Sequence, residues 1–185
     1  MAGPARHRHC SACGTAYADT RAYPRRCHAC GLAVWANPIP VAVALVPIAR
    51  AGRTCLLVVR TGLEPGRGKL ALVGGFIEEH ESWQVAAARE VREETGLVID
   101  PAEMRLFDVA SSEPRPDRLL VFATTDPVPF DRLPPFEPGG EVLSRGLIHG
   151  PGGIEHVFAF GPDIEAIRRW FAGRWIADPH DHTEC

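Results

Sequence analysis

The sequence predicts an α/β domain in which helices flank a mixed β-sheet, preceded by a small module that depends on a bound metal. Two observations predict this architecture. Two Cys-x-x-Cys pairs stand close together within the first 37 residues. After Pro38 and Pro40, β-rich runs alternate with a strongly patterned helix, and a second helix follows near the end. A chain of 185 residues suits one medium domain with an appendage, so we expect domains at residues 1–37 and 38–178.

The first module carries four cysteines in two pairs, and a glycine after each pair allows a tight turn. Four thiolates suit tetrahedral Zn²⁺. A segment this small usually needs a staple because it cannot build a sufficient hydrophobic core. The pattern therefore predicts a structural zinc ribbon, with two unrelated Cys-x-x-Cys pairs as the alternative. The predicted zinc ligands are Cys10, Cys13, Cys27 and Cys30.

The ribbon also carries a modest basic cluster and a few aromatic residues, which leaves two interpretations of its role. One is a structural or dimer-forming role. The other is contact with RNA, because arginines bind phosphates and aromatic rings stack on bases. The nearby His7, His9 and His28 are expected to be solvated, since four cysteines complete a zinc shell. The residues of the cluster are Arg6, Arg8, Arg21, Arg25, Arg26, Tyr17, Tyr23 and Trp35.

Composition argues against several classes of protein. The net charge of −3 gives no global basic field that would attract nucleic acid or an acidic membrane. The N-terminus lacks the apolar core of a signal peptide. The longest apolar run, Ile39 to Ala49, is shorter than the roughly 20 residues that span a bilayer. We therefore expect a cytoplasmic protein with no membrane partner, whose cysteines bind metal or remain free thiols.

Two cysteines lie outside the ribbon. Cys55 stands in an apolar run and is expected to be a small buried hydrophobe. Cys185 belongs to residues 179–185, which we expect to be a disordered tail. The run His180-Asp181-His182 in that tail could bind stray metal, but disorder is the simpler interpretation.

The second domain opens with two β-rich runs, over residues 41–49 and 54–60. Ala51-Gly52 between them is a hairpin signal. A glycine-rich polar loop follows over residues 61–69. The next strand begins at Leu70 and continues into Gly74-Gly75. These runs predict the first half of the sheet.

A helix is predicted between Ser82 as the N-cap and Gly96 as the C-cap. Trp83, Ala87 and Val91 recur at four-residue spacing and would form its buried face. The alanines at 86–88 let the helix approach the sheet closely.

Three glutamates of this helix share one face. Glu90, Glu93 and Glu94 are three and four residues apart, which places their Cβ atoms roughly 5–6 Å from one another. Like charges at this spacing repel, and hard divalent cations such as Mg²⁺ take oxygen ligands. The helix therefore predicts a metal site for chemistry on a phosphorylated substrate. A solvated acidic helix is the alternative.

The rest of the chain predicts strands over residues 105–110 and 119–124, followed by a proline-rich loop over residues 127–138. A last helix is expected from Asp163 to about Trp175. No internal repeat is evident. The apolar face of the last helix consists of Ile164, Ile167, Trp170 and Phe171.

The stretch around the glutamates resembles the Nudix box. That box is Gly, five residues, Glu, seven residues, Arg-Glu, an aliphatic residue, any residue, Glu-Glu, any residue, Gly and an aliphatic residue. All nine specified positions match over 23 residues. The matching residues are Gly75, Glu81, Arg89, Glu90, Val91, Glu93, Glu94, Gly96 and Leu97.

The resemblance implies an α/β/α sandwich with a mixed sheet and a pyrophosphohydrolase that depends on Mg²⁺ or Mn²⁺. It implies that Glu90, Glu93 and Glu94 are catalytic metal ligands. It adds the Gly74 carbonyl, from the turn before the box, to the metal ligands.

Other box positions are expected to be structural. By resemblance, Arg89 and Glu81 pair and brace the loop on the helix. Gly75 and Gly96 complete this structural set. The role expected for Arg89 and Glu81 is mainly structural.

Nudix relatives often take a further acid, base or ligand from a later loop. The candidates in this chain are Glu137, Glu141 and Glu155. We choose Glu141 because it follows Pro138-Gly139-Gly140, a flexible stretch. An ordinary loop carboxylate is the alternative.

A four-cysteine ribbon followed by a Nudix domain resembles the NADH pyrophosphatases. Their signature after the box is SQPWPFP followed closely by S, whereas residues 112–118 here read SEPRPDR. Charge thus replaces an apolar surface, so nicotinamide specificity does not follow. Arg115 and Arg118 either grip a substrate phosphate or are solvated loop charges. Pro114 resembles, more weakly, a proline of the Nudix ADP-ribose pyrophosphatases.

Three functions follow from these patterns. The first is a metal-dependent hydrolase that splits a nucleoside diphosphate linked to another moiety, such as NADH, NAD⁺ or ADP-ribose. The second is a ligand-binding regulator, although such proteins often lose box glutamates and this chain keeps them all. The third is an enzyme that removes NAD-type caps from RNA held by the ribbon. A homodimer is expected by resemblance only.

Overall fold

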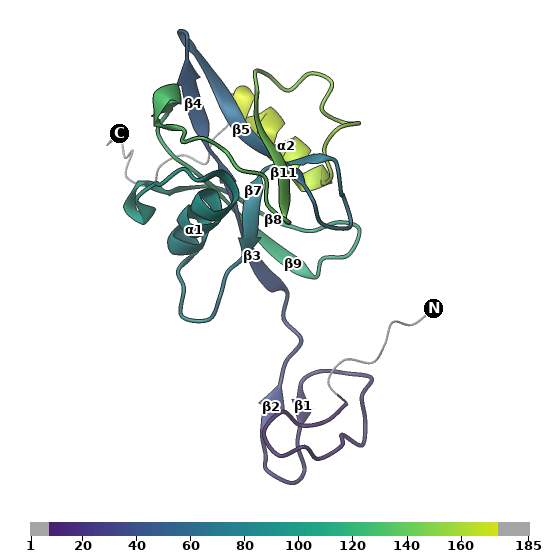
Figure 1. Ribbon diagram of the computed structural model, residues 1–185. Helices are drawn as coiled ribbons and strands as arrows, with labels where there is room; N and C mark the ends of the chain where they lie inside the picture. The colour runs from purple at the N-terminus through teal and green to yellow at the C-terminus, as the bar shows by residue number, and fades with distance from the viewer. Residues whose placement is uncertain (1–7, 174–185) are drawn as a thin grey trace, which may run out of the picture. The chain divides into compact units, whose positions relative to one another are not determined.

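The chain divides into two units between Pro38 and Ile39 in this computed structural model, which describes residues 8–173 (Figure 1). The division lies one residue after the boundary suggested by the sequence. The expectations for Arg6, His7 and residues 175–185 fall outside the described residues.

The first unit is built from two similar turns and a short antiparallel pair, β1 (Arg25–Arg26) and β2 (Ala33–Val34). The amide of Gly14 donates to the Cys10 carbonyl, and the amide of Gly31 donates to the Cys27 carbonyl, both at 2.9 Å. Both glycines have positive φ, 73° and 78°, which favours glycine. The sequence C-x-A-C-G-x-A occurs in both turns. The prediction that the chain has no internal repeat is therefore wrong for the first unit.

The second unit contains two mixed sheets (Figure 1). One has the strand order β7-β3-β9-β8, and the other has the order β10-β4-β5-β11, with β6 also paired to β5. Pairs β3–β9 and β4–β10 are parallel, and the other pairs are antiparallel. The strands are β3 (Ile39–Leu45), β4 (Pro47–Arg50), β5 (Arg53–Thr61), β6 (Leu70–Ala71), β7 (Val73–Phe76), β8 (Arg105–Ser111), β9 (Arg118–Thr124), β10 (Val128–Pro129) and β11 (Val142–Ile148).

Two runs that the sequence predicts as single strands are each divided between the sheets. The chain leaves one sheet at Val46, between β3 and β4, and again at Leu72, between β6 and β7. Both residues are buried, so the apolar run continues without a break through each corner. The sequence pattern therefore gives no signal that the chain changes sheets there. The Leu57 amide donates to the Val46 carbonyl at 2.9 Å and ties the first corner to β5.

Strands β10 and β11 were not predicted. The residues of β10 lie inside the proline-rich loop, where proline argues against a strand. Strand β11 contains Ser144, Arg145 and Gly146 and lacks a continuous apolar run. It is held instead by its long antiparallel pairing with β5, which includes a bulge between Val142 and Ser144.

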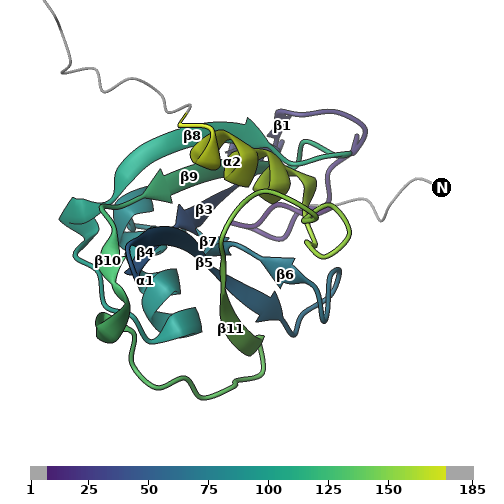
Figure 2. The same cartoon turned by 90° about the horizontal axis from the view of Figure 1, so that it is seen from above.

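The helices are α1 (Trp83–Thr95) and α2 (Gly161–Phe171), with 3₁₀ turns η1 (Pro101–Glu103) and η2 (Phe130–Arg132). They lie on opposite sides of the sheets (Figure 2), which confirms the α/β/α sandwich. The predicted caps of α1 are confirmed, whereas α2 starts two residues before Asp163 and ends at Phe171. No helix among residues 8–173 is long and apolar enough to cross a membrane.

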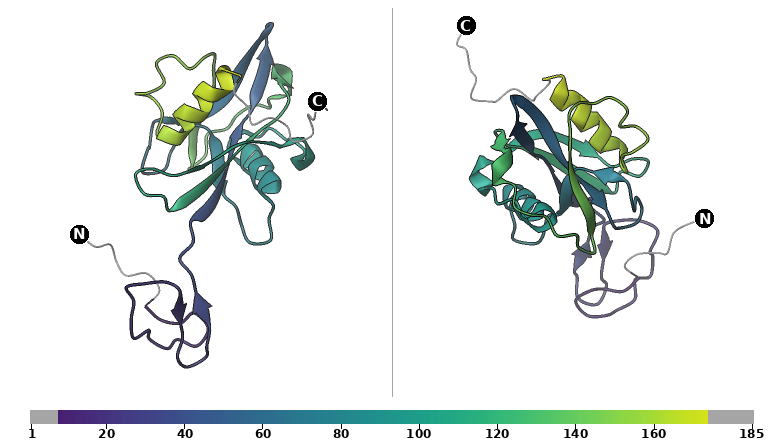
Figure 3. Two further views of the ribbon diagram at one scale, coloured as in Figure 1. Left: turned by 180° about the vertical axis from the view of Figure 1, so that it is seen from behind. Right: turned by 45° about the horizontal axis from the view of Figure 1, so that its top comes forward.

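Strands β4 and β5 form a hairpin at the edge of the fold (Figure 3). Ala51 and Gly52 form its turn with φ of 49° and 73°, as their hairpin signal predicts. Cys55, in β5, is fully buried as expected, and its Sγ lies 3.0 Å from Nδ1 of His149.

Asp163 ties α2 to the second corner of the sheets. Its side chain is buried, with 5% exposed, and its Oδ2 accepts a hydrogen bond of 3.0 Å from the Leu72 amide. Burial raises the pKa of Asp163 to about 7, against an ordinary value of 3.8. The folded protein therefore holds a proton there that the unfolded chain releases above about pH 4.

We expect the stability that Asp163 contributes to be full below about pH 4 and to be lost as the pH rises through about 7. Asp163→Asn cannot titrate. The free energy of unfolding of the wild type, relative to this variant, should fall by more than about 1 kcal/mol across that range, since one pKa unit corresponds to about 1.4 kcal/mol. Urea unfolding at several pH values measures it. Asp100→Asn is the control, because Asp100 is exposed and also accepts a backbone amide, that of Ala102. A pH-independent difference for Asp163→Asn would contradict the assignment.

Candidate active site

Helix α1, which carries the box glutamates Glu90, Glu93 and Glu94, is capped at both ends. Ser82 Oγ accepts a hydrogen bond of 3.3 Å from the Val85 amide. Gly96 has φ of 75° and its amide donates to the Arg92 carbonyl at 2.8 Å. The buried face of the helix packs against β3 and β7. The helix therefore cannot easily rotate or slide, and the glutamates keep their direction.

A pocket of about 240 Å³ lies beside α1. One wall consists of Glu90, Glu93 and Glu94 of the helix. The facing wall comes from residues 136–142, which include Glu137 and Glu141 just before β11. The structure thus brings the three predicted box glutamates and the predicted Glu141 to one pocket.

Arg89 holds the loop before α1 against the helix. Its Nε and Nη2 donate to the two carboxylate oxygens of Glu81 at 2.9 and 3.1 Å, a bidentate pair. Nη2 also donates to the Phe76 carbonyl at 3.0 Å. The hydrogen bonds from Arg89 lower the pKa of Glu81 below its ordinary value. The pairing that the resemblance implies for Arg89 and Glu81 is thus present.

Arg89 also orients the pocket carboxylates. Its Nη1 donates to Glu90 Oε1 at 2.7 Å and to Glu93 Oε2 at 3.2 Å. The Glu90 side chain is only 13% exposed, so this partner offsets part of the cost of its burial. Glu93 is half exposed and also lies 3.4 Å from Arg92.

Two glycines of the turn before the box are required by close packing. A Cβ on Gly75 would lie 2.2 Å from Glu90 Oε1, so only glycine leaves room for that carboxylate. A Cβ on Gly74 would lie 2.4 Å from the Ala42 carbonyl oxygen. The Gly74 backbone lowers the pKa of the Glu94 carboxyl and so opposes part of the effect of burial. The Gly74 carbonyl as a metal ligand stays a prediction.

Glu94 has an uncompensated oxygen in the pocket. Its Oε2 is buried and has no hydrogen-bond partner among the described residues. Burial, followed by the charge of Glu90, raises the pKa of Glu94 to about 8. Burial likewise raises the pKa of Glu90, while Arg89 opposes the shift. The charge of Glu141 raises both pKa values further.

The pocket therefore fits a hard divalent cation. Its donors are carboxylate oxygens, which Mg²⁺ and Mn²⁺ prefer. A cation would give Glu94 Oε2 a partner and would neutralise carboxylates that repel one another. The chemistry of the donors and the orphaned oxygen both suit such an ion. Among residues 8–173 only the four cysteines already place three or more ligand atoms within 4.8 Å of one another, so the carboxylates would have to draw closer around a bound cation.

The three candidates for an additional catalytic carboxylate from a later loop differ in where they lie. Glu137 and Glu141 line the pocket. The charge of Glu141 also raises the pKa values of both Glu90 and Glu94. Glu155 instead forms an ion pair with Arg168 of α2. The geometry thus favours Glu141 among the three.

Neither of the two predicted substrate arginines lines the pocket: Arg115 lies in the β8–β9 loop, and Arg118 is the first residue of β9. Arg115 is exposed, and its carbonyl accepts a hydrogen bond of 2.6 Å from Ser112 Oγ. Arg118 pairs with Asp117 at 3.2 Å and stands over the ring of Phe76, 5.6 Å from its centroid. Phe76 is 54% exposed and was missed by the sequence analysis, although it directly follows Gly75.

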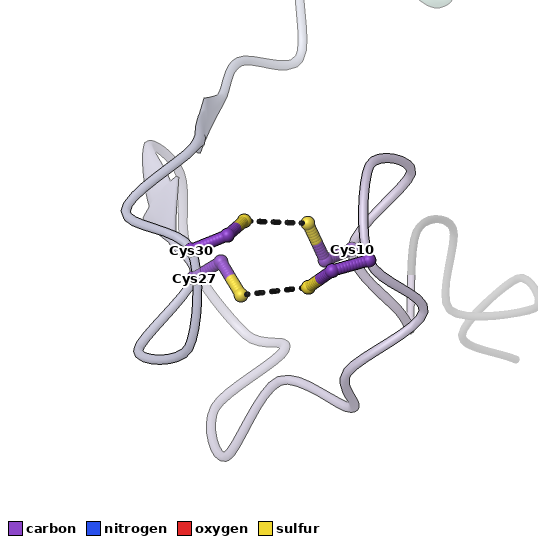
Figure 4. Close-up of side chains that lie close together, drawn as sticks. Cys10, Cys27 and Cys30 are labelled. Atoms are coloured by element: carbon purple, nitrogen blue, oxygen red, sulfur yellow. Dashed lines mark hydrogen bonds between the residues drawn. The ribbon is translucent and has the colours of Figure 1, made fainter.

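The four ribbon cysteines form a separate candidate metal site (Figure 4). The sulfurs of Cys10 and Cys30 are 3.5 Å apart, those of Cys13 and Cys27 are 3.6 Å apart, and all four lie within 4.8 Å of one another. These distances exceed the roughly 2.0 Å of a disulfide. They are close to the edge of a tetrahedron with zinc–sulfur bonds of ~2.3 Å, about 3.8 Å. The cluster therefore has the donors and the spacing that tetrahedral zinc requires.

Comparison with known proteins places this geometry in a family. The family profile of the NUDIX domain matches residues 38–145, more than half of the chain. The NAD-capped RNA hydrolase NudC of Deinococcus radiodurans is 29% identical over 134 residues, 72% of this chain and 46% of that protein. The ADP-ribose pyrophosphatase of Methanocaldococcus jannaschii is 40% identical over 63 residues, 34% of this chain and 36% of that protein. The matches span less than half of the length of these curated relatives.

Solved structures agree on the fold. A NUDIX hydrolase from Nitrosomonas europaea superposes with a TM-score of 0.70 at 23% identity, over 90% of this chain and 92% of that chain. A bifunctional NMN adenylyltransferase/ADP ribose pyrophosphatase from Francisella tularensis gives a TM-score of 0.59 at 20% identity, over 76% of this chain and 42% of that one. The sequence match, the fold and the box geometry agree, and the chain belongs to the Nudix family.

Proposed function

We propose that this protein is a metal-dependent hydrolase that cleaves the diphosphate of a nucleoside diphosphate linked to another moiety. The observation that carries the proposal is the buried, unpartnered Oε2 of Glu94 in a pocket shared with Glu90 and Glu141. An arrangement of carboxylates that repel one another is costly unless a cation joins them. The named activities of the two curated relatives support the same reaction class.

The chain's own groups divide the work. Glu90, Glu93, Glu94 and the Gly74 carbonyl would hold Mg²⁺ or Mn²⁺, which when bound neutralises phosphate charge and makes water nucleophilic. Arg89 fixes the direction of the Glu90 carboxylate through the hydrogen bond at 2.7 Å. Glu141 is the proposed general base or additional ligand, because it faces the helix glutamates across the pocket.

The proposed substrates share an adenosine diphosphate: NADH, NAD⁺, ADP-ribose or a related dinucleotide. A nucleotide also needs a surface for a base and a partner for phosphate charge. The exposed ring of Phe76, with Arg118 over it, offers both beside the turn that carries Gly74. Arg115 is a second candidate for phosphate contact. A panel of substrates, assayed side by side, would show which of these compounds the protein cleaves.

A second candidate function is the removal of NAD-type caps from RNA. It is favoured by the name of the Deinococcus radiodurans relative and by the arginines of the ribbon. The same pocket would act, while Arg8, Arg21 and Arg26 would bind the RNA backbone. Binding of capped RNA that weakens steeply with salt would support it over cleavage of the free dinucleotide alone.

The ribbon is proposed to bind Zn²⁺ for a structural purpose and to take part in a homodimer. Zinc would join the two repeated turns, each of which supplies two sulfurs. Sedimentation of the full chain with and without zinc would test the dimer. A regulator without catalysis is the least supported reading, because every box glutamate is retained.

The proposal predicts that Glu94→Gln lowers kcat by roughly 100-fold or more while the fold persists, because the isosteric amide cannot supply an anionic ligand. The assay is phosphate release with Mg²⁺ or Mn²⁺ and a coupled phosphatase, on NADH, NAD⁺, ADP-ribose, diadenosine polyphosphates, nucleotide sugars and triphosphates. Glu103→Gln is the control, since Glu103 is exposed on η1, outside the pocket. Near-normal turnover by Glu94→Gln would rule out the metal assignment.

The raised pKa of Glu94 predicts that metal affinity depends on pH. A proton held up to about pH 8 must leave before the carboxylate binds a cation. Affinity for Mn²⁺ should therefore rise with pH by about tenfold per unit below pH 8 and level off above it. Electron paramagnetic resonance of free Mn²⁺ between pH 6 and 9 measures this. Glu94→Gln should bind more weakly and with a smaller slope; an unchanged slope would contradict the role of Glu94.

Zinc should be required for the ribbon and not for the second unit. Cys27→Ser should lose stoichiometric zinc, since structural zinc contributes on the order of 10 kcal/mol to small domains. Metal analysis and limited proteolysis would follow the loss, with cleavage expected between residues 8 and 38. Cys55→Ser is the matched control, because Cys55 is buried in β5 and is not a member of the cluster. Full zinc content in Cys27→Ser would exclude that cysteine as a ligand.

A further inference from the structure

Arg145 of β11 joins the box helix to the opposite wall of the pocket. Its Nη1 donates to the carbonyl of Thr95, the last residue of α1. Its Nη2 donates to the Pro134 carbonyl at 2.7 Å, and the guanidinium stands over the ring of Phe136, 5.4 Å from the centroid. One half-buried side chain therefore contacts two segments that are about 40 residues apart in the sequence.

Both of these segments lead directly to pocket carboxylates. The Thr95 carbonyl has no partner within the helix, because the last carbonyls of a helix never do, and it follows Glu94 immediately. Pro134 begins the segment of residues 134–141, called here the wall loop. The wall loop carries Glu137 and Glu141 into the pocket. Arg145 thus bonds the helix just after Glu94, and it bonds the wall loop just before Glu137.

The far end of the wall loop has a separate anchor. The Gly62 amide donates to the Glu141 carbonyl at 2.8 Å. A Cβ on Gly62 would lie 2.5 Å from the Gly140 carbonyl oxygen, so the contact needs glycine. Gly139 and Gly140 themselves meet nothing within 4 Å of where a Cβ would stand. Between the two anchors, Phe136 packs against the core and the Gly139 amide donates to the Val142 carbonyl at 3.0 Å. The two anchors therefore set the position of the loop together with these contacts.

We propose that Arg145 is a positioning residue that sets the separation of Glu141 from the helix glutamates, and thereby the metal affinity of the pocket. The inference rests on the proposed function. A planar guanidinium can donate to two carbonyls in different directions and lie over an aromatic ring at once. Lysine has the same charge but one ammonium on a flexible stem, so it cannot keep all three contacts.

The experiment is a double-mutant cycle on the full chain with Arg145→Lys and Glu141→Gln. The first readout is the Kd for Mn²⁺ without nucleotide, and the second is kcat and KM for ADP-ribose. Arg145→Lys should weaken Mn²⁺ binding about tenfold and lower kcat about tenfold, with KM changed less than about twofold. In the Glu141→Gln background the same change should have less than about a twofold effect, because residues that act through one group are not additive.

Arg132→Lys is the matched control. Arg132 also donates to a backbone carbonyl, that of Val98 at 3.1 Å, but it does not line the pocket. It should leave both readouts unchanged. Thermal unfolding of each variant accompanies the binding data. If Arg145→Lys does not fold, Gly62→Ala displaces the wall loop from its other end and should give the same loss of Mn²⁺ affinity, again only when Glu141 is present.

Each other result overturns the inference in a recognisable way. If Arg145→Lys binds Mn²⁺ like the wild type, the contacts do not control the pocket. If its effect is equally large with Glu141→Gln, Arg145 acts on overall stability and not through Glu141. If the wild type itself binds no Mn²⁺ and hydrolyses no substrate, the proposed function fails, and the inference fails with it.

Discussion

The guanidinium of Arg89 is the contact on which the pocket depends. The segment between β7 and α1 has no regular structure. Its path is set by a few backbone bonds, such as that from the Ile77 amide to the Pro40 carbonyl at 3.1 Å, and by side-chain bonds. Arg89 supplies them by donating to Glu81 and to the Phe76 carbonyl. The same group donates to Glu90 and keeps its carboxylate against the bare backbone of Gly75. One residue thus fixes both the loop and the first carboxylate of the pocket, in a geometry that lysine could not reproduce.

The pocket holds buried carboxylates whose ionised forms are electrostatically unfavourable. Burial raises the pKa values of Glu90 and Glu94, which means that the ionised forms are unfavourable there. Arg89 compensates Glu90 directly but leaves Oε2 of Glu94 without a partner. A bound cation would remove this cost, so the metal-bound form should be more stable than the free protein. The buried, mutually repelling carboxylates of Glu90 and Glu94 would thus both destabilise the metal-free protein and attract the cation.

The sequence predicted most of the site wherever the relevant contacts are local. Residues three and four apart on a helix are neighbours by geometry, and caps act within one turn, so the box helix could be predicted from Ser82 to Gly96. The four-cysteine cluster followed from the spacing of its cysteines. The position of Glu141 could only be guessed, since nothing in the sequence places it opposite Glu94.

The features that were missed depend on pairing between distant segments. Strand β11 exists because β5 offers it an edge, not because its own residues favour a strand. The corners at Val46 and Leu72 lie within apolar runs that look like ordinary strands. Arg145 could not be recognised, because its partners are backbone carbonyls, which have no sequence signature.

Those two corners have a consequence for how the second unit comes apart. The run from β3 to β4 and the run from β6 to β7 each pass from one sheet to the other through a single residue, and a short link from β9 to β10 also joins the two sheets. Opening either sheet would therefore disturb strands of the other through these short links. Unfolding should therefore be all-or-none, with no long-lived form that keeps only half of the sandwich. One wall of the pocket is on α1 and the other leads into β11. The pocket would therefore be lost in the same unfolding step as the core.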